Sequence, residues 1–208
     1  MDHTKAILHT SESLFLRYGI RSVSMDDIAR ELGMSKKTLY QCVENKSDLI
    51  GRIVESRIDG EKQDMARIVD ESENAVEEMV RIGNYVIEKL RQFSPTIIYD
   101  LQKYYSEVWK KMESLHLSHV YQLIRDNIER GKQEGAYRKG VDADIVAKLY
   151  VAKTSLVVDE ELFPTGQYDK EVLFRQYISY HLHGLIAEGS LDMLGRYMEK
   201  YYDESHKP

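Results

Sequence analysis

The sequence predicts an all-α protein. Apolar residues recur at three- and four-residue steps over long stretches, which is the spacing of one face of a helix. Alternating apolar and polar runs, which are typical of strands, are scarce. The 208 residues include only three prolines, Pro95, Pro164 and Pro208, so this helix breaker leaves long segments uninterrupted.

The first fifty residues predict a head of three short helices. The first helix covers about residues 4–18 and ends before Gly19, where a left-handed C-cap residue is expected. The second begins after Ser24, because Ser24 and Asp27 have the spacing of a capping box, and it stops at Gly33. The third opens at Ser35. Two such helices joined by a sharp glycine turn predict a helix-turn-helix.

The remaining chain, residues 51–208, predicts a larger helical domain. Asn45 is the expected cap of a fourth helix, which runs past Ile58. Further amphipathic stretches follow at 61–70, 74–92, 95–108, 112–134, 142–159 and 169–188, with a short helix near 190–202.

The charges are divided unevenly between these two parts. Residues 1–50 contain seven basic and seven acidic residues. Of the 29 basic and 35 acidic residues in the chain, 22 and 28 therefore lie in residues 51–208, which carry the whole net charge of −6. An acidic body disfavours indiscriminate binding to nucleic acids and leaves the head as the part that can approach phosphates. A lone Cys42 and the lack of a signal peptide or a long apolar run predict a cytoplasmic protein with no membrane partner.

The third predicted helix has the composition of a DNA-reading helix. In a helix-turn-helix, the second helix enters the major groove and its N-terminal residues face base edges. Lysine can donate to guanine, glutamine can pair with adenine, and a threonine methyl can touch thymine. Helix N-termini, a phenol and a further lysine supply phosphate contacts. The predicted DNA-contacting residues are Ser24, Ser35, Lys36, Lys37, Thr38, Tyr40, Gln41 and Lys46.

A set of short motifs follows in a fixed order along the first quarter of the chain: Ile7-Leu8, Leu14-Phe15, Gly19, Ser24, Ile28-Ala29, Gly33-Met34-Ser35, Thr38-Leu39-Tyr40 and Lys46-Ser47-Asp48-Leu49. In order and spacing this set resembles the N-terminal signature of TetR-family regulators. A shorter stretch, residues 130–137, resembles the turn before the family's dimerisation helices. The resemblance implies a homodimer, a palindromic operator in double-stranded DNA, and repression relieved by a small-molecule effector in the C-terminal domain.

Four head residues depart from the family pattern: Ser24, Lys37, Cys42 and Val43. Ser24 keeps the hydroxyl of the usual threonine, so a phosphate contact survives. Lys37 replaces a small residue and adds a donor.

Two later stretches predict the dimer interface. One helix-turn-helix contacts too few base pairs for specificity in a genome, so two-fold pairing is expected. The apolar faces of 142–159 and 169–188 would form a four-helix bundle with a second copy, the alternative being packing within one chain. The predicted interface residues are Ile145, Leu149, Ala152, Leu156, Leu173, Tyr177, Tyr180, Gly184 and Leu185.

Aromatic residues concentrate in the middle of the chain, where they form either ordinary core or a pocket for a flat or apolar ligand. The candidate pocket residues are Tyr85, Tyr105, Trp109, Met112, His116 and Tyr121. The sequence does not identify the ligand.

Two other interpretations remain open. Glu113, His116 and His119 share a helix face and resemble half of a carboxylate-bridged metal site. The sequence holds no second Glu-x-x-His, which disfavours a metal enzyme, and we predict no catalytic residue and no cofactor. The other alternative is a helical adaptor that does not bind DNA.

Overall fold

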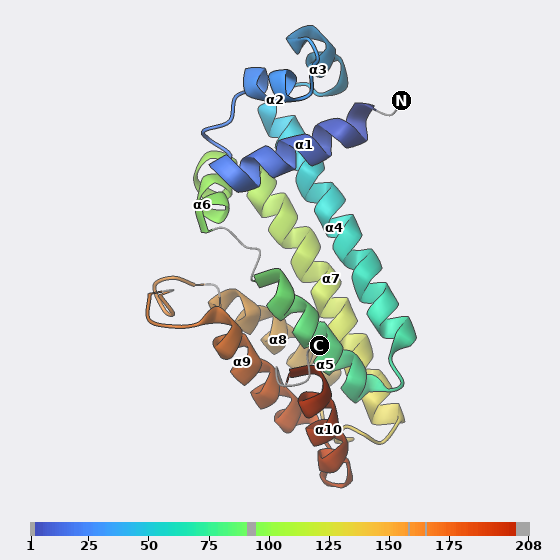
Figure 1. The fold of residues 1–208 in the computed structure, drawn as a ribbon. Helices are drawn as coiled ribbons and strands as arrows, with labels where there is room; N and C mark the ends of the chain where they lie inside the picture. The colour runs from blue at the N-terminus through green and yellow to red at the C-terminus, as the bar shows by residue number, and fades with distance from the viewer. Residues whose placement is uncertain (1–2, 91–94, 158, 165, 203–208) are drawn as a thin grey trace. The chain divides into compact units, whose positions relative to one another are not determined.

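The computed structural model describes residues 3–90, 95–157, 159–164 and 166–202, and within these ranges the secondary structure is almost entirely helical. The pairing of Tyr137 with Ile186 is an isolated antiparallel bridge. The all-α prediction is confirmed. The elements are α1 (His3–Tyr18), α2 (Met25–Glu31), α3 (Lys36–Cys42), α4 (Lys46–Glu71), α5 (Ala75–Leu90), α6 (Pro95–Tyr104), α7 (Ser106–Gln133), α8 (Ala143–Val157), α9 (Lys170–Leu185), the 3-10 helix η1 (Glu188–Ser190) and α10 (Leu191–Tyr202) (Figure 1).

Helix boundaries in the head agree closely with the expectation, whereas two later boundaries do not. The stretch 61–70 is no separate helix, because α4 runs on through Gly60 to Glu71. Gly60 is not among the glycines with positive φ, and a glycine inside a helix costs only about 1 kcal/mol. The boundary between α6 and α7 lies at Tyr105, not between residues 108 and 112.

The chain separates into two compact units. Unit 1 comprises Met1–Lys62 and Phe93–His116, and unit 2 comprises Gln63–Gln92 and Leu117–Pro208. The long helices α4 and α7 each contribute residues to both units. No helix in the described ranges combines the length and the apolar character needed to cross a bilayer.

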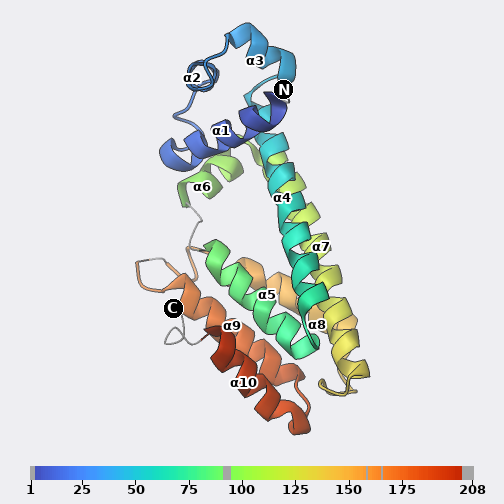
Figure 2. The ribbon, with the colours of Figure 1, turned by 45° about the vertical axis from the view of Figure 1, so that its right-hand side comes forward.

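Unit 1 contains the predicted helix-turn-helix on a core of its own. Ile7 of α1, Ile28 of α2 and Leu39 of α3 are fully buried together, and Leu49 of α4 joins them. Leu101 of α6 closes the same core. Both ribbon views show α1 lying between α3 and α6 (Figures 1 and 2). The core therefore holds α2 and α3 on one side of α1 and α6 on the other.

Unit 2 is built around α5, which packs against α9 and α10. Met79 of α5 and Ile178 and Leu182 of α9 are fully buried in its core. Gly83 allows this close packing, since a Cβ at that position would lie 2.1 Å from the hydroxyl of Tyr202.

The turn at residues 130–137 is a packed structural junction in unit 2. Arg130 pairs with the buried carboxylate of Glu78 at 2.7 Å and with Glu134 at the same distance. The Tyr137 ring covers Gly131 so closely that a Cβ there would lie 2.2 Å from a ring carbon. Its hydroxyl donates to the carbonyl of Ala75 at 3.0 Å. These contacts fix the end of α7 against the start of α5.

Candidate nucleic-acid interface

The N-terminus of α2 is formed by a complete capping box. The hydroxyl of Ser24 accepts the Asp27 N–H at 3.2 Å, and the Ser24 N–H donates to the Asp27 carboxylate at 2.9 Å. Hydrogen bonds from the Ser24 side chain and backbone lower the pKa of Asp27. Ser24 is exposed, so its hydroxyl and the first N–H groups of α2 lie at the surface of the head.

A glycine turn then sets α3 against α2. Gly33 has a φ of +62°, a left-handed conformation that favours glycine, and the Met34 N–H donates back to the Ala29 carbonyl at 3.0 Å. Ser35 caps α3 by accepting the Thr38 N–H at 3.1 Å. The local chemistry that predicted both helix starts is therefore present in the structure.

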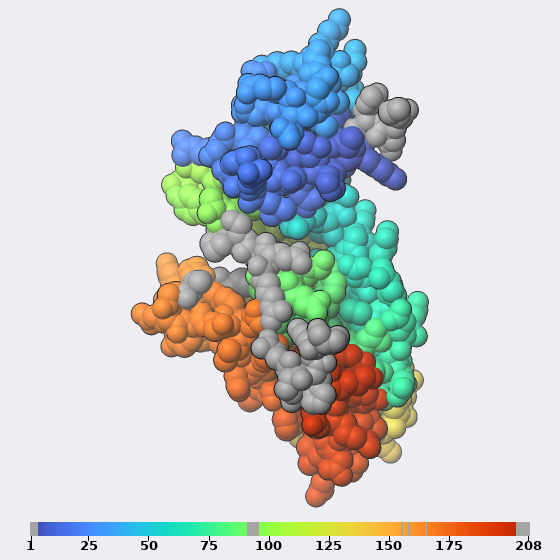
Figure 3. All heavy atoms as spheres, in the orientation of Figure 1, coloured from blue at the N-terminus to red at the C-terminus, as the bar shows by residue number. Residues whose placement is uncertain are grey.

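The two faces of α3 differ in polarity. Leu39 is fully buried and anchors the helix to the core of unit 1. The rest of the helix exposes Lys36, Lys37, Tyr40 and Gln41, and the space-filling view shows α2 and α3, in light blue, on the surface (Figure 3). Ammonium, phenol and amide groups therefore project from one short helix, as base and phosphate recognition requires.

An ion pair connects this face to α2. Nζ of Lys36 lies 2.9 Å from Oδ1 of Asp26, and the carboxylate raises the pKa of the lysine. Asp26 lies in the first turn of α2, two residues after Ser24. The predicted base-reading residues and the predicted phosphate contact at Ser24 thus lie on adjoining helix N-termini.

Lys46 takes a position that sequence reasoning missed. Its ammonium donates to the carbonyl oxygens of Ile20, at 2.6 Å, and of Val23. Burial lowers the pKa of Lys46, against the attraction of Asp100 and Asp27. A lysine has three donors, so one N–H remains beyond these two for a phosphate.

The six predicted pocket residues are divided between the units. Tyr105, Trp109, Met112 and His116 lie in unit 1, while Tyr85 and Tyr121 lie in unit 2. Tyr105 and Trp109 pack against the core of the head. The hydroxyl of Tyr85 donates to Asp64 at 3.1 Å.

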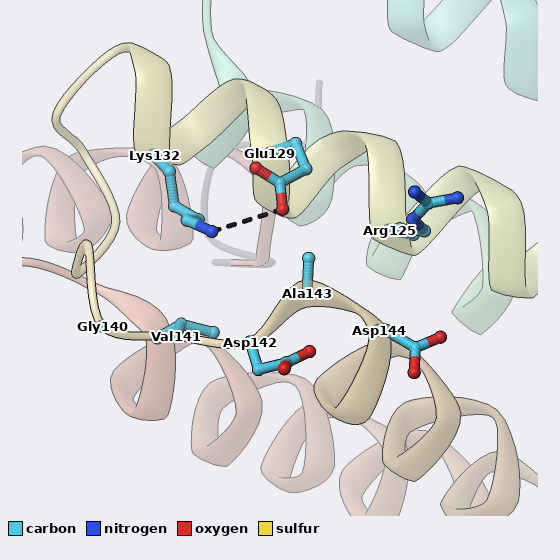
Figure 4. Close-up of a pocket in the computed structure, with 8 residues that line it drawn as sticks. All are labelled: Arg125, Glu129, Lys132, Gly140, Val141, Asp142, Ala143 and Asp144. Atoms are coloured by element: carbon cyan, nitrogen blue, oxygen red, sulfur yellow. Dashed lines mark hydrogen bonds and ion pairs between the residues drawn. The ribbon is translucent and has the colours of Figure 1, made fainter.

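Unit 2 has an open surface hollow of about 410 Å³ between α7 and the start of α8 (Figure 4). Its lining is Arg125, Glu129, Lys132, Gly140, Val141, Asp142, Ala143 and Asp144. Of the predicted pocket residues, Tyr121 reaches this rim, where its hydroxyl donates to the lining residue Asp144 at 2.6 Å. Charged groups dominate the hollow, so its lining differs from the aromatic pocket that the sequence suggested.

The metal interpretation receives no support from side-chain placement. Within the ranges that the structure describes, no three His, Cys, Asp or Glu side chains are grouped so that they could hold a metal ion. Glu113, His116 and His119 therefore do not form such a group. Nδ1 of His116 instead lies 3.5 Å from the carboxylate of Glu61 on α4.

The predicted dimer residues differ in how far their side chains are exposed. Ile145, Leu149, Leu156 and Tyr180 are large apolar or aromatic side chains that stay exposed, Tyr180 to 70%. Ala152 and Gly184 are also exposed, and Leu173 and Tyr177 are half-buried. Leu185, by contrast, is 1% exposed in the core of its own unit, so it cannot belong to an open face.

Comparisons with known proteins agree with this architecture. Residues 7–53 match the family model of bacterial regulatory proteins of the tetR family. The HTH-type transcriptional regulator YvaF of Bacillus subtilis is 23% identical over 90% of this chain and 98% of its own length. The HTH-type transcriptional repressor KstR2 of Mycobacterium tuberculosis is 20% identical over 88% of this chain and 92% of its own.

A solved structure extends the similarity to the fold of the whole chain. The transcriptional regulator from Saccharomonospora viridis, solved in complex with choline, is 22% identical and has a TM-score of 0.69 over 90% of this chain and 99% of that one. Residues 7–53, which match the family model, contain the capped α2, the glycine turn and α3. Residues 7–53, which hold the helix-turn-helix of unit 1, thus match the tetR family of bacterial regulatory proteins, and the rest of the chain is similar in fold to a transcriptional regulator.

Proposed function

We propose that this protein is a homodimeric transcriptional regulator that binds a palindromic operator and leaves it when a small molecule binds. The observation that carries the proposal is the exposed polar face of α3 beside the capped N-terminus of α2. In a helix-turn-helix this is the surface that enters the major groove. Residues 1–50 would supply DNA binding, and residues 51–208 effector binding and dimerisation.

Base reading is assigned to α3 and its N-cap. Ser35, Lys36, Lys37, Thr38 and Gln41 would face base edges, because none of them is buried, whereas Leu39 anchors the helix to the core. Ser24, Tyr40 and the remaining donor of Lys46 would hold phosphates. Phosphate contacts fix the position of the head on the duplex, while base contacts supply the sequence preference.

Dimerisation is assigned to the exposed faces of α8 and α9. Ile145, Leu149 and Leu156 lie at steps of four and seven along α8, and Tyr180 lies on α9. Large exposed apolar side chains on neighbouring helices mark surfaces that pack against a partner. Pairing of two such faces across a two-fold axis would place two heads on the two halves of a palindrome.

Effector binding is inferred from the similarity to tetR-family regulators and is not assigned to particular residues. The similar regulator from Saccharomonospora viridis was solved with choline, and KstR2 is named a repressor, which supports a ligand-released repressor. Such a protein acts in the cytoplasm, where the bacterial chromosome is located.

Selection of bound sequences from a random pool of double-stranded DNA tests the proposal. We expect a palindromic motif, and we expect affinity for it to fall steeply with salt, as for proteins that displace counterions from phosphates. Lys110→Ala removes an exposed lysine of α7, outside the helix-turn-helix, and as a control variant it should select the same motif. Recovery of no motif, with equally weak binding to every duplex, would favour the adaptor interpretation.

A further inference from the structure

The loop between α1 and α2, residues 19–23, is held by side chains from two other helices. From α4, Lys46 donates to the carbonyl oxygens of Ile20 and Val23. From α6, Asp100 accepts the backbone N–H of Arg21 through Oδ2 at 3.1 Å. Three backbone groups within four residues therefore bind side chains of two other helices.

Asp100 is an unusual residue for a helix that packs on an apolar core. Asp100 is only 5% exposed, and burial of a carboxylate is unfavourable unless hydrogen bonds and an opposite charge compensate for the lost hydration. Compensation comes from the Arg21 N–H and from the attraction of the half-buried Lys46 ammonium. A carboxylate and an ammonium that attract each other thus both bind the backbone of this loop.

Neighbouring contacts restrict the loop further. Gly19 turns the chain with a φ of +82°, and a Cβ there would lie 3.7 Å from both Oδ2 of Asp100 and a methyl of Thr96. The Arg21 guanidinium donates to the Tyr104 hydroxyl at 2.9 Å and stacks over that ring. Backbone and side chain of Arg21 are therefore both attached to α6.

This loop leads directly into the DNA-facing surface. Val23, whose carbonyl binds Lys46, precedes Ser24, the N-cap of α2. Because α3 is joined to α2 by the Gly33 turn and the Lys36–Asp26 ion pair, a shift of the loop displaces both helices. Base contacts depend on directional hydrogen bonds, whereas attraction to phosphates acts over a longer range.

We propose that Asp100 is a positioning residue for DNA recognition: it holds the α1–α2 loop so that Ser24 and α3 face the groove in the correct position. The inference rests on the proposed function of the head. Asp100 touches no DNA itself and acts through the backbone of Arg21.

The test compares affinity for the selected operator with affinity for random duplex in the full-length protein. Asp100→Ala removes the acceptor, and we expect the ratio of the two affinities to fall about fivefold or more, the equivalent of one lost hydrogen bond. Asp100→Asn keeps an oxygen that can accept the Arg21 N–H, so its ratio should stay close to that of the wild type. Tyr99→Phe is the control, since Tyr99 is exposed on α6 and hydrogen bonds to Lys103 of the same helix.

The ratio separates positioning from simple loss of folded protein. Unfolding of part of the sample lowers both affinities by the same factor and leaves the ratio unchanged, and an unchanged ratio overturns the inference. Should Asp100→Ala fail to fold, as measured by helical circular dichroism, Asp100→Ser is judged by the same ratio, because its side chain is too short to reach Arg21. A wild-type protein that selects no sequence would instead refute the proposed function, whatever Asp100 does.

Discussion

Lys36 and Asp26 join the two helices of the helix-turn-helix, with 2.9 Å between Nζ and Oδ1. In the proposed complex the carboxylate would compete with DNA for the lysine and would repel nearby phosphates. We predict that Asp26→Asn binds the operator several-fold more tightly, with a salt dependence steeper by about one unit. Fluorescence anisotropy at several salt concentrations measures both. Glu31→Gln makes the same charge change elsewhere on α2, and an equal gain in that variant would contradict a specific role for the ion pair.

Removal of Lys36 itself tests base reading. Lys36→Ala should weaken operator binding by about 5- to 150-fold and relax the preference at one base position, because a base-edge contact is lost. Binding to variants of the selected motif, each with one changed base pair, measures this preference. If all duplexes are weakened equally, Lys36 contacts phosphate only.

Tyr40 tests the assignment of a phosphate contact on the same helix. Tyr40 is 43% exposed on α3, and its hydroxyl is the group expected to donate to a phosphate oxygen. Tyr40→Phe should therefore weaken binding to the operator and to random duplex alike, without altering the motif recovered by selection. Tyr18→Phe, which changes another exposed tyrosine of the head, serves as the control. A changed motif would show that Tyr40 reads bases.

Local chemistry explains which parts of the head were predictable from sequence. Ser24, Ser35 and Gly33 act on residues no more than five positions away, so α2 begins after Ser24 and ends before Gly33, and α3 begins after Ser35, as expected. The internal role of Lys46 was not predictable, because its partners are backbone carbonyls 23 and 26 positions earlier in the chain. Backbone acceptors carry no sequence pattern.

Long-range packing explains the remaining differences. The bond from Arg21 to Asp100 spans 79 positions, and no periodicity in the sequence relates the two. Leu185 shares an apolar helix with Tyr180, yet one faces the core and the other solvent. Periodicity finds the apolar faces of a helix, but the choice between core and interface depends on neighbours that only the fold supplies.

The exposed face of α8 gives a prediction about assembly. Leu149 is 50% exposed, and in the proposed dimer it would lie between two apolar helices. Leu149→Glu would place a carboxylate in that apolar contact, so we expect a shift from dimer to monomer and weaker operator binding. Sedimentation velocity at micromolar concentration measures the shift. Leu191→Glu changes a leucine of similar exposure on α10, and a monomer in that variant too would mean that the effect is not specific to α8.

His181 gives a prediction about stability and pH. Its ring lies 4.8 Å from the Tyr150 ring, and Nε2 is buried with no hydrogen-bond partner among the described residues. Burial, together with the nearby charge of Lys153, lowers the pKa of His181 to about 4. In the unfolded chain the pKa is close to the ordinary value of about 6.5. The folded state therefore favours the neutral form of the His181 ring.

The sign of the effect follows from proton uptake. Well above pH 6.5 the imidazole is neutral in both states, so its ionisation does not reduce the free energy of unfolding. As the pH falls from 6.5 toward 4, the unfolded chain binds a proton that the folded chain does not, so the free energy of unfolding decreases by up to roughly 3 kcal/mol. Urea denaturation at pH 7.5 and 4.5 should show this loss in the wild type and a smaller loss in His181→Phe. His183→Gln, which removes an exposed histidine of the same helix, should behave as the wild type. Equal losses in the wild type and His181→Phe would mean that His181 takes up its proton without opposing the fold.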